Sequence, residues 1–283
     1  MDQTMTERAI LIVNQARDLP PMPTVAQKVL DLLQSEKTTA GDIEQVITSE
    51  AALSARVLKI ANSAIFGRRT GARTVSEAVT YLGFKTVKSI VLAAAMKTFY
   101  MQPRLADHLM WVHSMGVALA AAELSRFSHI GSPDEALTAG LLHDLGKLVF
   151  KNYDPEGFDA VMQSIYNDQT DAVTVEIETF GVAHPQVAEQ VLAKWGFPDQ
   201  LREPVAMHHI ASTQPEEVSA EAHLVCLADA VCHHLGIGTR MANCDLTLGE
   251  LPSAKRLKLS AAQLSEFAED FPQRFAERRL MFE

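Results

Sequence analysis

The sequence has little of what would place it among secreted, disulfide-bonded or membrane proteins. Only three of its 283 residues are cysteine (Cys226, Cys232 and Cys244), and their spacing is not that of a zinc ribbon. The apolar run over residues 90–96 ends at Lys97, far short of the roughly 20 residues that cross a bilayer. The first residues carry no basic segment of a cleavable signal. We therefore expect a reduced, cytoplasmic protein with no membrane partner.

Basic residues are also in the minority. The chain has 25 Lys and Arg against 35 Asp and Glu, which gives a net charge of −10. Broad nucleic-acid binding relies on neutralising phosphates with Lys and Arg, so this balance argues against a nucleic-acid partner. Hydrophobic residues make up 47% and charged residues 21% of the chain, which is typical of a globular protein.

Patterns typical of β-strands are scarce, whereas helix signals recur along the chain. Capping boxes at Thr24–Gln27, Thr39–Asp42 and Thr74–Glu77 each predict the start of a helix. The β-branched run Val173–Thr179 could form a strand, but we interpret it as helical because helices are predicted on both sides. A last helix is predicted over residues 261–271, ending before Pro272. The fold class is therefore predicted to be all-α.

Histidine is missing from the first part of the chain. All ten histidines follow Gln102–Pro103, and the residues before that point show no concentration of metal-ligand side chains. We predict two lobes: an N-terminal helical bundle over residues 1–103, and a second helical lobe over residues 104–283 that carries the candidate site.

Seven histidine and aspartate residues of the second lobe form a candidate metal site. They are His113, His143, Asp144, His184, His208, His209 and Asp229. Imidazole nitrogen and carboxylate oxygen suit a divalent transition metal such as Fe, Mn, Ni or Zn. Seven ligands exceed the need of one tetrahedral ion and would suffice for two ions bridged by Asp144, an arrangement that can activate a phosphoester. Lys147, at i+3 from Asp144, could meet a substrate phosphate or simply pair with Asp144.

Each of these residues also has an ordinary structural interpretation. His113 could be a satisfied helical histidine, His184 could cap the helix that Pro185 begins, and the pair at 208–209 could face solvent. Asp229 is different, because a carboxylate among apolar neighbours is costly unless it is paired or binds metal. The run Cys232–His233–His234 is predicted to be exposed surface, because adjacent helical residues diverge by about 100° and cannot converge on one ion.

The segment Ala139–Lys147, AGLLHDLGK, resembles the HD superfamily of metal-dependent phosphohydrolases. His113–Ser114 matches the upstream histidine of that superfamily. His184–Pro185, His208–His209 and Ala228–Asp229 follow in the order of its two-metal members, notably the HD-GYP cyclic-dinucleotide phosphodiesterases. The resemblance thus implies that all seven ligand types are present. The residues after His209, IASTQP, lack the Gly-Tyr-Pro loop of HD-GYP enzymes, which speaks against cyclic-di-GMP hydrolysis.

Residues 15–235 as a whole are similar to the HDOD family, HD-related output domains of bacterial signalling. The motifs that carry this resemblance are Leu19–Pro23, Asn62–Ala64, Phe66–Gly67, Ala78–Val79, Leu82–Gly83, Trp195–Pro198 and Met207–His209.

Two functions therefore stay open. The HDOD resemblance, which we place first, implies a signal-transduction output module that relays a cue to signalling proteins and keeps a metal-binding HD site. The alternative is a metal-dependent phosphohydrolase or phosphodiesterase acting on a nucleotide or other phosphoester, with Asp144 and Lys147 as catalytic residues.

Overall fold

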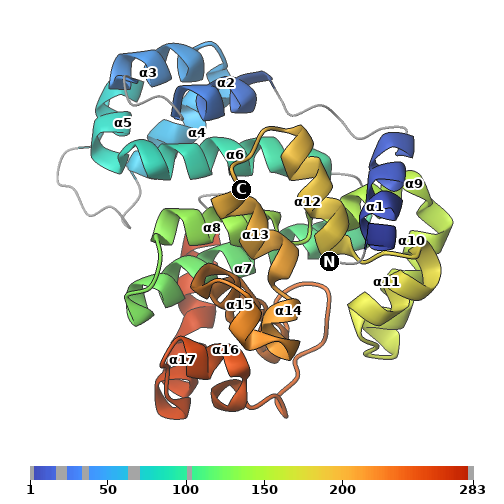
Figure 1. Ribbon diagram of the computed structural model, residues 1–283. Coiled ribbons are helices and arrows are strands. Elements are labelled where there is room, and N and C mark those ends of the chain that lie inside the picture. The colour runs from blue at the N-terminus through green and yellow to red at the C-terminus, as the bar shows by residue number, and fades with distance from the viewer. Residues whose placement is uncertain (1–2, 17–23, 34–37, 63–70, 101–103, 280–283) are drawn as a thin grey trace. The chain divides into compact units, whose positions relative to one another are not determined.

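The structure, a computed structural model, describes residues 3–16, 24–33, 38–62, 71–100 and 104–279. These residues form helices joined by turns and loops, with no β-strand among them (Figure 1). The prediction of an all-α fold is confirmed, and so is the helical interpretation of residues 173–179, which lie in α11 (Ala172–Phe180). The Leu19–Pro23 motif and most of residues 62–67 lie outside the described residues.

Contacts between the helices divide the chain into two units. One unit comprises Met1–Leu19 and Tyr100–Phe275, and the other Pro20–Phe99 and Ala276–Glu283. The first helix, α1 (Gln3–Gln15), thus belongs to the same unit as the candidate site. Its Arg8 Nε donates a hydrogen bond of 2.8 Å to the carbonyl oxygen of Phe180. The sequence-based division into lobes of residues 1–103 and 104–283 stays a prediction.

The unit of residues 20–99 consists of short amphipathic helices. They are α2 (Thr24–Leu33), α3 (Ala40–Thr48), α4 (Ala51–Ala61), α5 (Val75–Leu82) and α6 (Phe84–Tyr100). The side chain of Thr39 accepts a hydrogen bond from the backbone N–H of Asp42, whose carboxylate bonds back to Thr39, so this predicted capping box is present. Ile43 and Ile47 are buried on α3, which packs against α4 and α5. The apolar faces at helical spacing thus make the core of this unit.

The other unit is built around one long helix, α7 (Leu105–Ser128), whose middle is apolar and buried on all sides. The helices of this unit after α1 are α7, α8 (Pro133–Leu142), α9 (Leu145–Tyr153), α10 (Pro155–Asn167), α11, α12 (His184–Lys194), α13 (Asp199–Met207), α14 (Ile210–Thr213), α15 (Ala220–Leu235), α16 (Pro252–Arg256) and α17 (Ala261–Arg278), with 3-10 turns at Pro215–Glu217 and Leu248–Glu250. Residues 117–122 of α7 are all buried, as expected for a central helix. Helices α8 and α15 pack against α7. A Cβ on Gly140 would lie 2.8 Å from Ala118 Cα, so this glycine lets α8 approach α7 closely.

Two predicted helix ends differ from the structure. The last helix continues through Pro272 to Arg278 instead of ending at Phe271. Proline removes one backbone hydrogen bond, but Phe275 in the following turn is buried and its ring lies 6.0 Å from that of Phe271, so packing outweighs the lost bond. The i+3 relation of Asp144 and Lys147 assumes a helix that continues through this pair, but α8 ends at Leu142 and α9 begins at Leu145.

Length and apolar character decide whether a helix of the described residues could cross a membrane. No single helix there is both long and apolar enough to cross a bilayer, and one bent pair, Val75–Leu82 with Thr86–Tyr100, reaches that length and composition jointly.

Candidate metal centre

The junction between α8 and α9 places His143 and Asp144 in the interior. Both are 1% exposed. Lys147, on the first turn of α9, points its Nζ at the Asp144 carboxylate at 2.8 Å. Gly146 sits between them, and a Cβ there would lie 2.1 Å from the carbonyl oxygen of His184. Only glycine allows α9 to approach the start of α12 this closely, and this approach brings Asp144 to His184.

The structure brings all seven sequence-predicted ligand residues together in the unit of residues 100–275. His113 comes from the middle of α7, His184 from the first turn of α12, and Asp229 from α15. His208 and His209 lie in the junction between α13 and α14, which allows two adjacent side chains to face the same space. Within the cluster, His209 is half-buried, and Asp229 is 8% exposed, whereas His113, His184 and His208 are at most 1% exposed.

The two carboxylate oxygens of Asp144 face different histidines. Oδ2 lies 3.5 Å from His143 Nε2 and 3.9 Å from His113 Nε2. Oδ1 lies 3.2 Å from His184 Nε2. A second carboxylate closes the first group, since Asp229 Oδ1 is 3.0 Å from His113 Nε2 and 4.0 Å from His143 Nε2. Asp144 is therefore placed between two sets of nitrogen ligands.

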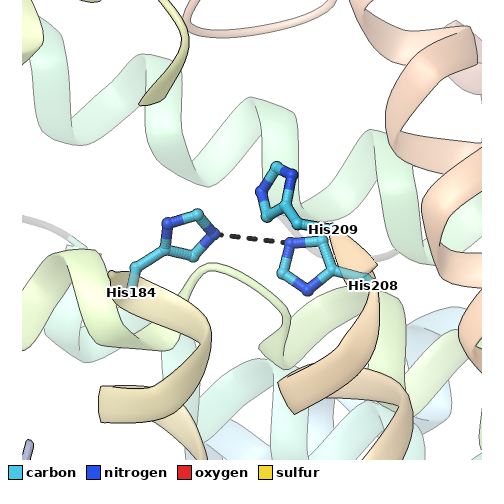
Figure 2. A group of neighbouring side chains, drawn as sticks. All are labelled: His184, His208 and His209. Atoms are coloured by element: carbon cyan, nitrogen blue, oxygen red, sulfur yellow. Dashed lines mark hydrogen bonds between the residues drawn. The ribbon is translucent and has the colours of Figure 1, made fainter. Parts of the chain in front are cut away.

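The second set consists of three histidines (Figure 2). The Nε2 atoms of His184 and His208 are 3.4 Å apart. The ring of His209 lies 4.2 Å from that of His208 and 5.0 Å from that of His184, measured between centroids. One ligand atom from each of the three lies within 4.8 Å of the other two, and the same is true of His113, His143 and Asp144.

A layer of hydrogen bonds behind the cluster fixes the imidazole rings. The Nδ1–H groups of His143 and His208 donate to the carbonyl oxygens of Gly140 and Val205, each at 2.7 Å. His113 Nδ1 donates to Ile237 at 3.0 Å. Each bond leaves Nε2 as the nitrogen that faces the cluster.

Glu176 does the same for His184. Its Oε2 accepts the backbone N–H of His184 at 2.8 Å and shares a hydrogen bond of 2.6 Å with Nδ1. This carboxylate is 1% exposed, and burial raises its pKa to about 8 despite the nearby charge of Lys147. The residues alone gave no sign of this role, because a single Glu in a β-branched run has no motif around it.

The protonation states favoured by the fold are those of metal ligands. Burial lowers the pKa of His143 and His208 to about 4, and that of His184 and His209 well below the usual value. Burial alone would raise the pKa of Asp144, but His143 and Lys147 hold it well below its usual value. His113 is the exception, because burial would lower its pKa but the adjacent Asp229 and Asp144 raise it above its usual value. At neutral pH the other four imidazoles of the cluster are thus neutral, and Asp144 is ionised.

Some of these atoms lack partners that the protein could supply. His143 Nε2 and Asp229 Oδ1 are buried and, within the described chain, make no hydrogen bond of acceptable geometry. Unpartnered buried polar atoms are costly, and a cation between them would satisfy both. The donor set therefore fits a divalent metal ion.

Comparison with known proteins places the chain in a family. The model of the HDOD domain matches residues 19–211. The chain belongs to the HDOD family. The resemblance recognised in the sequence is thereby confirmed.

The HDOD fold is shared with solved structures. An HDOD domain protein of unknown function from Geobacter sulfurreducens superposes with a TM-score of 0.85 at 19% identity, covering 99% of this chain and 98% of that one. A protein from Shewanella amazonensis SB2B, described as a candidate phosphohydrolase, gives 0.75 at 23% identity, covering 97% and 98%. An uncharacterised protein of Treponema pallidum is 23% identical over 239 residues, which are 82% of this chain. The HDOD chain spans about half of that relative's length, 46%.

The run Cys232–His233–His234 is not the exposed surface that was predicted. Cys232 is fully buried, and His233 and His234 are half-buried. His233 Nε2 lies 3.4 Å from Asp229 Oδ1. The three residues do diverge around α15, as the prediction assumed, but His233 is at i+4 from Asp229 and shares its face. That spacing was the signal in the HDOD sequence that could have found it.

Proposed function

We propose that this HDOD protein is a metal-dependent phosphohydrolase that binds two divalent transition-metal ions. The observation that carries the proposal is the convergence of two buried carboxylates, Asp144 and Asp229, with five histidines, with ligand atoms left unpartnered among the described residues. Fe, Mn, Ni and Zn all suit such nitrogen and oxygen ligands.

Asp144 divides the ligands between two ions in this proposal. One set comprises His113, His143 and Asp229, and the other His184, His208 and His209. The distances from Asp144 support this division, since Oδ2 faces His143 at 3.5 Å and Oδ1 faces His184 at 3.2 Å. Divalent ions in such a site supply Lewis-acid polarisation of a phosphoryl oxygen and lower the pKa of water.

Lys147 contributes positive charge next to the bridging carboxylate. Its Nζ is 2.8 Å from Asp144 and its side chain is 9% exposed. Burial would lower the pKa of Lys147, but Asp144 and Glu176 raise it, so the ammonium stays charged. We infer that Lys147 holds Asp144 ionised and meets an anionic phosphoester oxygen that approaches the site.

The proposal is tested with protein stripped of metal and reconstituted with Mn²⁺, Fe²⁺, Ni²⁺ or Zn²⁺. Metal content is measured by mass spectrometry, and activity with bis(p-nitrophenyl) phosphate and a set of nucleotides and cyclic dinucleotides. We expect about two ions per chain and hydrolysis of at least one phosphoester, with both lost in Asp144→Ala.

Asp107→Ala is the matched control. Asp107 is also a fully buried carboxylate paired with a lysine, Lys151 Nζ at 2.6 Å, but it lies outside the cluster. Loss of folding on removing a buried carboxylate would affect both variants, whereas loss of metal should affect only Asp144→Ala. A wild-type protein that takes up no metal would overturn the metal site, and loaded protein that hydrolyses none of these substrates would overturn the enzymatic function.

A second candidate function is signal-transduction output through protein contacts. The observation in its favour is that the HDOD match begins at residue 19 and so includes the unit of residues 20–99, which holds no metal-ligand cluster among its described residues. Deletion of the gene and complementation with the wild type or Asp144→Ala would test it. Complementation by Asp144→Ala, together with cross-linking to the same partner proteins, would support signalling that needs no metal. If the deletion has no phenotype and the wild-type protein cross-links to no partner protein, the signalling function is contradicted.

A further inference from the structure

His233 lies on the same face of α15 as Asp229, one helical turn further along. The i,i+4 spacing brings its Nε2 to 3.4 Å from Asp229 Oδ1. The His233 side chain is 23% exposed and that of Asp229 11%, against 1% for His113. Asp229 and His233 thus lie where the first ligand set meets solvent.

His113 and His233 approach Asp229 together. The two rings stack with 5.0 Å between centroids and an angle of 9°. Their Nε2 atoms lie 3.0 and 3.4 Å from the same oxygen, Asp229 Oδ1. One ligand atom from each of the three residues lies within 4.8 Å of the other two.

The two rings are held differently. His113 Nδ1 donates to the carbonyl of Ile237, so a neutral His113 offers only the lone pair of Nε2 and can bind a single ion. His233 therefore joins the ion at His113 and Asp229 rather than a separate one. The neighbouring His234 bonds away from this point, through Nδ1 to the carbonyl of Asn243 at 3.1 Å.

We propose that His233 is a further metal ligand, which binds the divalent transition-metal ion held by His113 and Asp229 from the solvent side. This inference rests on the proposed metal-binding function. It gives the ion of the first set one more nitrogen ligand than the sequence-predicted residues supply, and it places that ligand where solvent reaches the site.

The test is Co²⁺ titration of metal-free full-length protein, followed by the visible absorption of Co²⁺ and by metal content. The variants are His233→Ala, His233→Gln and the control His234→Ala. Removing even an outer partner of a ligand typically costs about 10- to 100-fold in metal affinity, so we expect one of the two ions to bind at least ~10-fold more weakly in both His233 variants. The other ion should bind as in the wild type, and His234→Ala should match the wild type.

Added imidazole provides a second readout, because His233 is partly exposed. Imidazole should restore the Co²⁺ spectrum of His233→Ala and leave that of His234→Ala unchanged. If His233 only donates a hydrogen bond to Asp229, the spectrum and stoichiometry of the His233 variants will equal those of the wild type, and this inference is wrong while the metal site stands. A wild type that binds no Co²⁺ contradicts the proposed function itself.

Discussion

Replacing Gly146 by alanine tests how the fold brings Asp144 to His184. A Cβ at this position would lie 2.1 Å from the carbonyl oxygen of His184, where ordinary contacts begin at 3.4 Å. The alanine Cβ is fixed to the backbone of α9, and the atom that it meets is a backbone oxygen, so no side chain can rotate to relieve the clash. The start of α12 and the first turn of α9 must separate by about 1.3 Å, the difference between 3.4 and 2.1 Å, to relieve it.

The expected magnitude follows from two opposing effects. Overpacking in a filled interior costs typically ~1–3 kcal/mol, and a backbone clash of this size belongs at the upper end. Alanine in place of glycine within a helix returns about 1 kcal/mol. We expect a net loss of about 2 kcal/mol in the free energy of unfolding, which corresponds to a fall in Tm of about 4–8 °C.

Urea unfolding followed by circular dichroism, together with metal titration, measures both consequences. Metal affinity should fall by about 10-fold or more, because the clash displaces His184. Gly41→Ala is the control: Gly41 also lies in a helix, and its nearest contact would be an ordinary 3.7 Å to Thr39, so alanine should be neutral or stabilising by up to ~1 kcal/mol. A Gly146→Ala protein that is as stable as Gly41→Ala and binds metal like the wild type would refute the close approach of α9 to α12.

Three further predictions concern the site. Metal at 1,000 times its Kd should stabilise the wild type by about 4 kcal/mol, which calorimetry would record as a rise in Tm of about 8–16 °C. The same rise in an Asp144→Ala protein would contradict the role of Asp144 as a metal ligand. Glu176→Ala should lower metal affinity by ~10-fold or more in calorimetric titration, because the acceptor oxygen that orients the His184 ring is lost. Glu176→Gln, which keeps an acceptor oxygen, is the control, and equal affinity in both variants would show that Glu176 does not position the ligand. The urea midpoint of the metal-free protein should fall as pH drops from 6.5 to 4. In that range the unfolded histidines take up protons, whereas buried His143 and His208, with a folded pKa of about 4, stay neutral. Two buried groups act in the opposite sense, Glu176 with its pKa raised to about 8 and His113 with its pKa raised by Asp229. A midpoint that rises on acidification would contradict the prediction, because these two groups would then outweigh His143 and His208.

The helices were predictable where local signals agree with packing. The capping signals at Thr39–Asp42 and Thr74–Glu77 begin α3 and α5 as predicted. Prediction failed at Pro272, where burial of Phe275 one turn later keeps the helix going. Local propensity could not reveal this, because it does not include the tertiary contact that outweighs it.

The membership of the cluster was likewise more predictable than its surroundings. All seven predicted residues meet because motif order carries information about which residues share a site, even when they are as far apart in the chain as His113 and Asp229. His233 and Glu176 belong to no motif. The rule that adjacent helical residues diverge was applied to His233 and its neighbours, while the relation that matters is with Asp229 one turn earlier.

The energetics of the cluster bear on whether it is only a structural remnant. Apolar contacts of α7 with α8 and α15 already hold this unit together, so the fold has no need of two buried carboxylates and an unpartnered imidazole nitrogen. Lys147 offsets the charge of Asp144, and the backbone carbonyl of Gly140 holds the His143 ring in place while its inward-facing Nε2 has no partner among the described residues. A buried set of acceptors that the protein orients but does not satisfy destabilises the metal-free state. Bound cations would satisfy these acceptors and remove the destabilisation, so the relief adds to the free energy of metal binding. The geometry therefore favours a metal-binding site over a vestigial one.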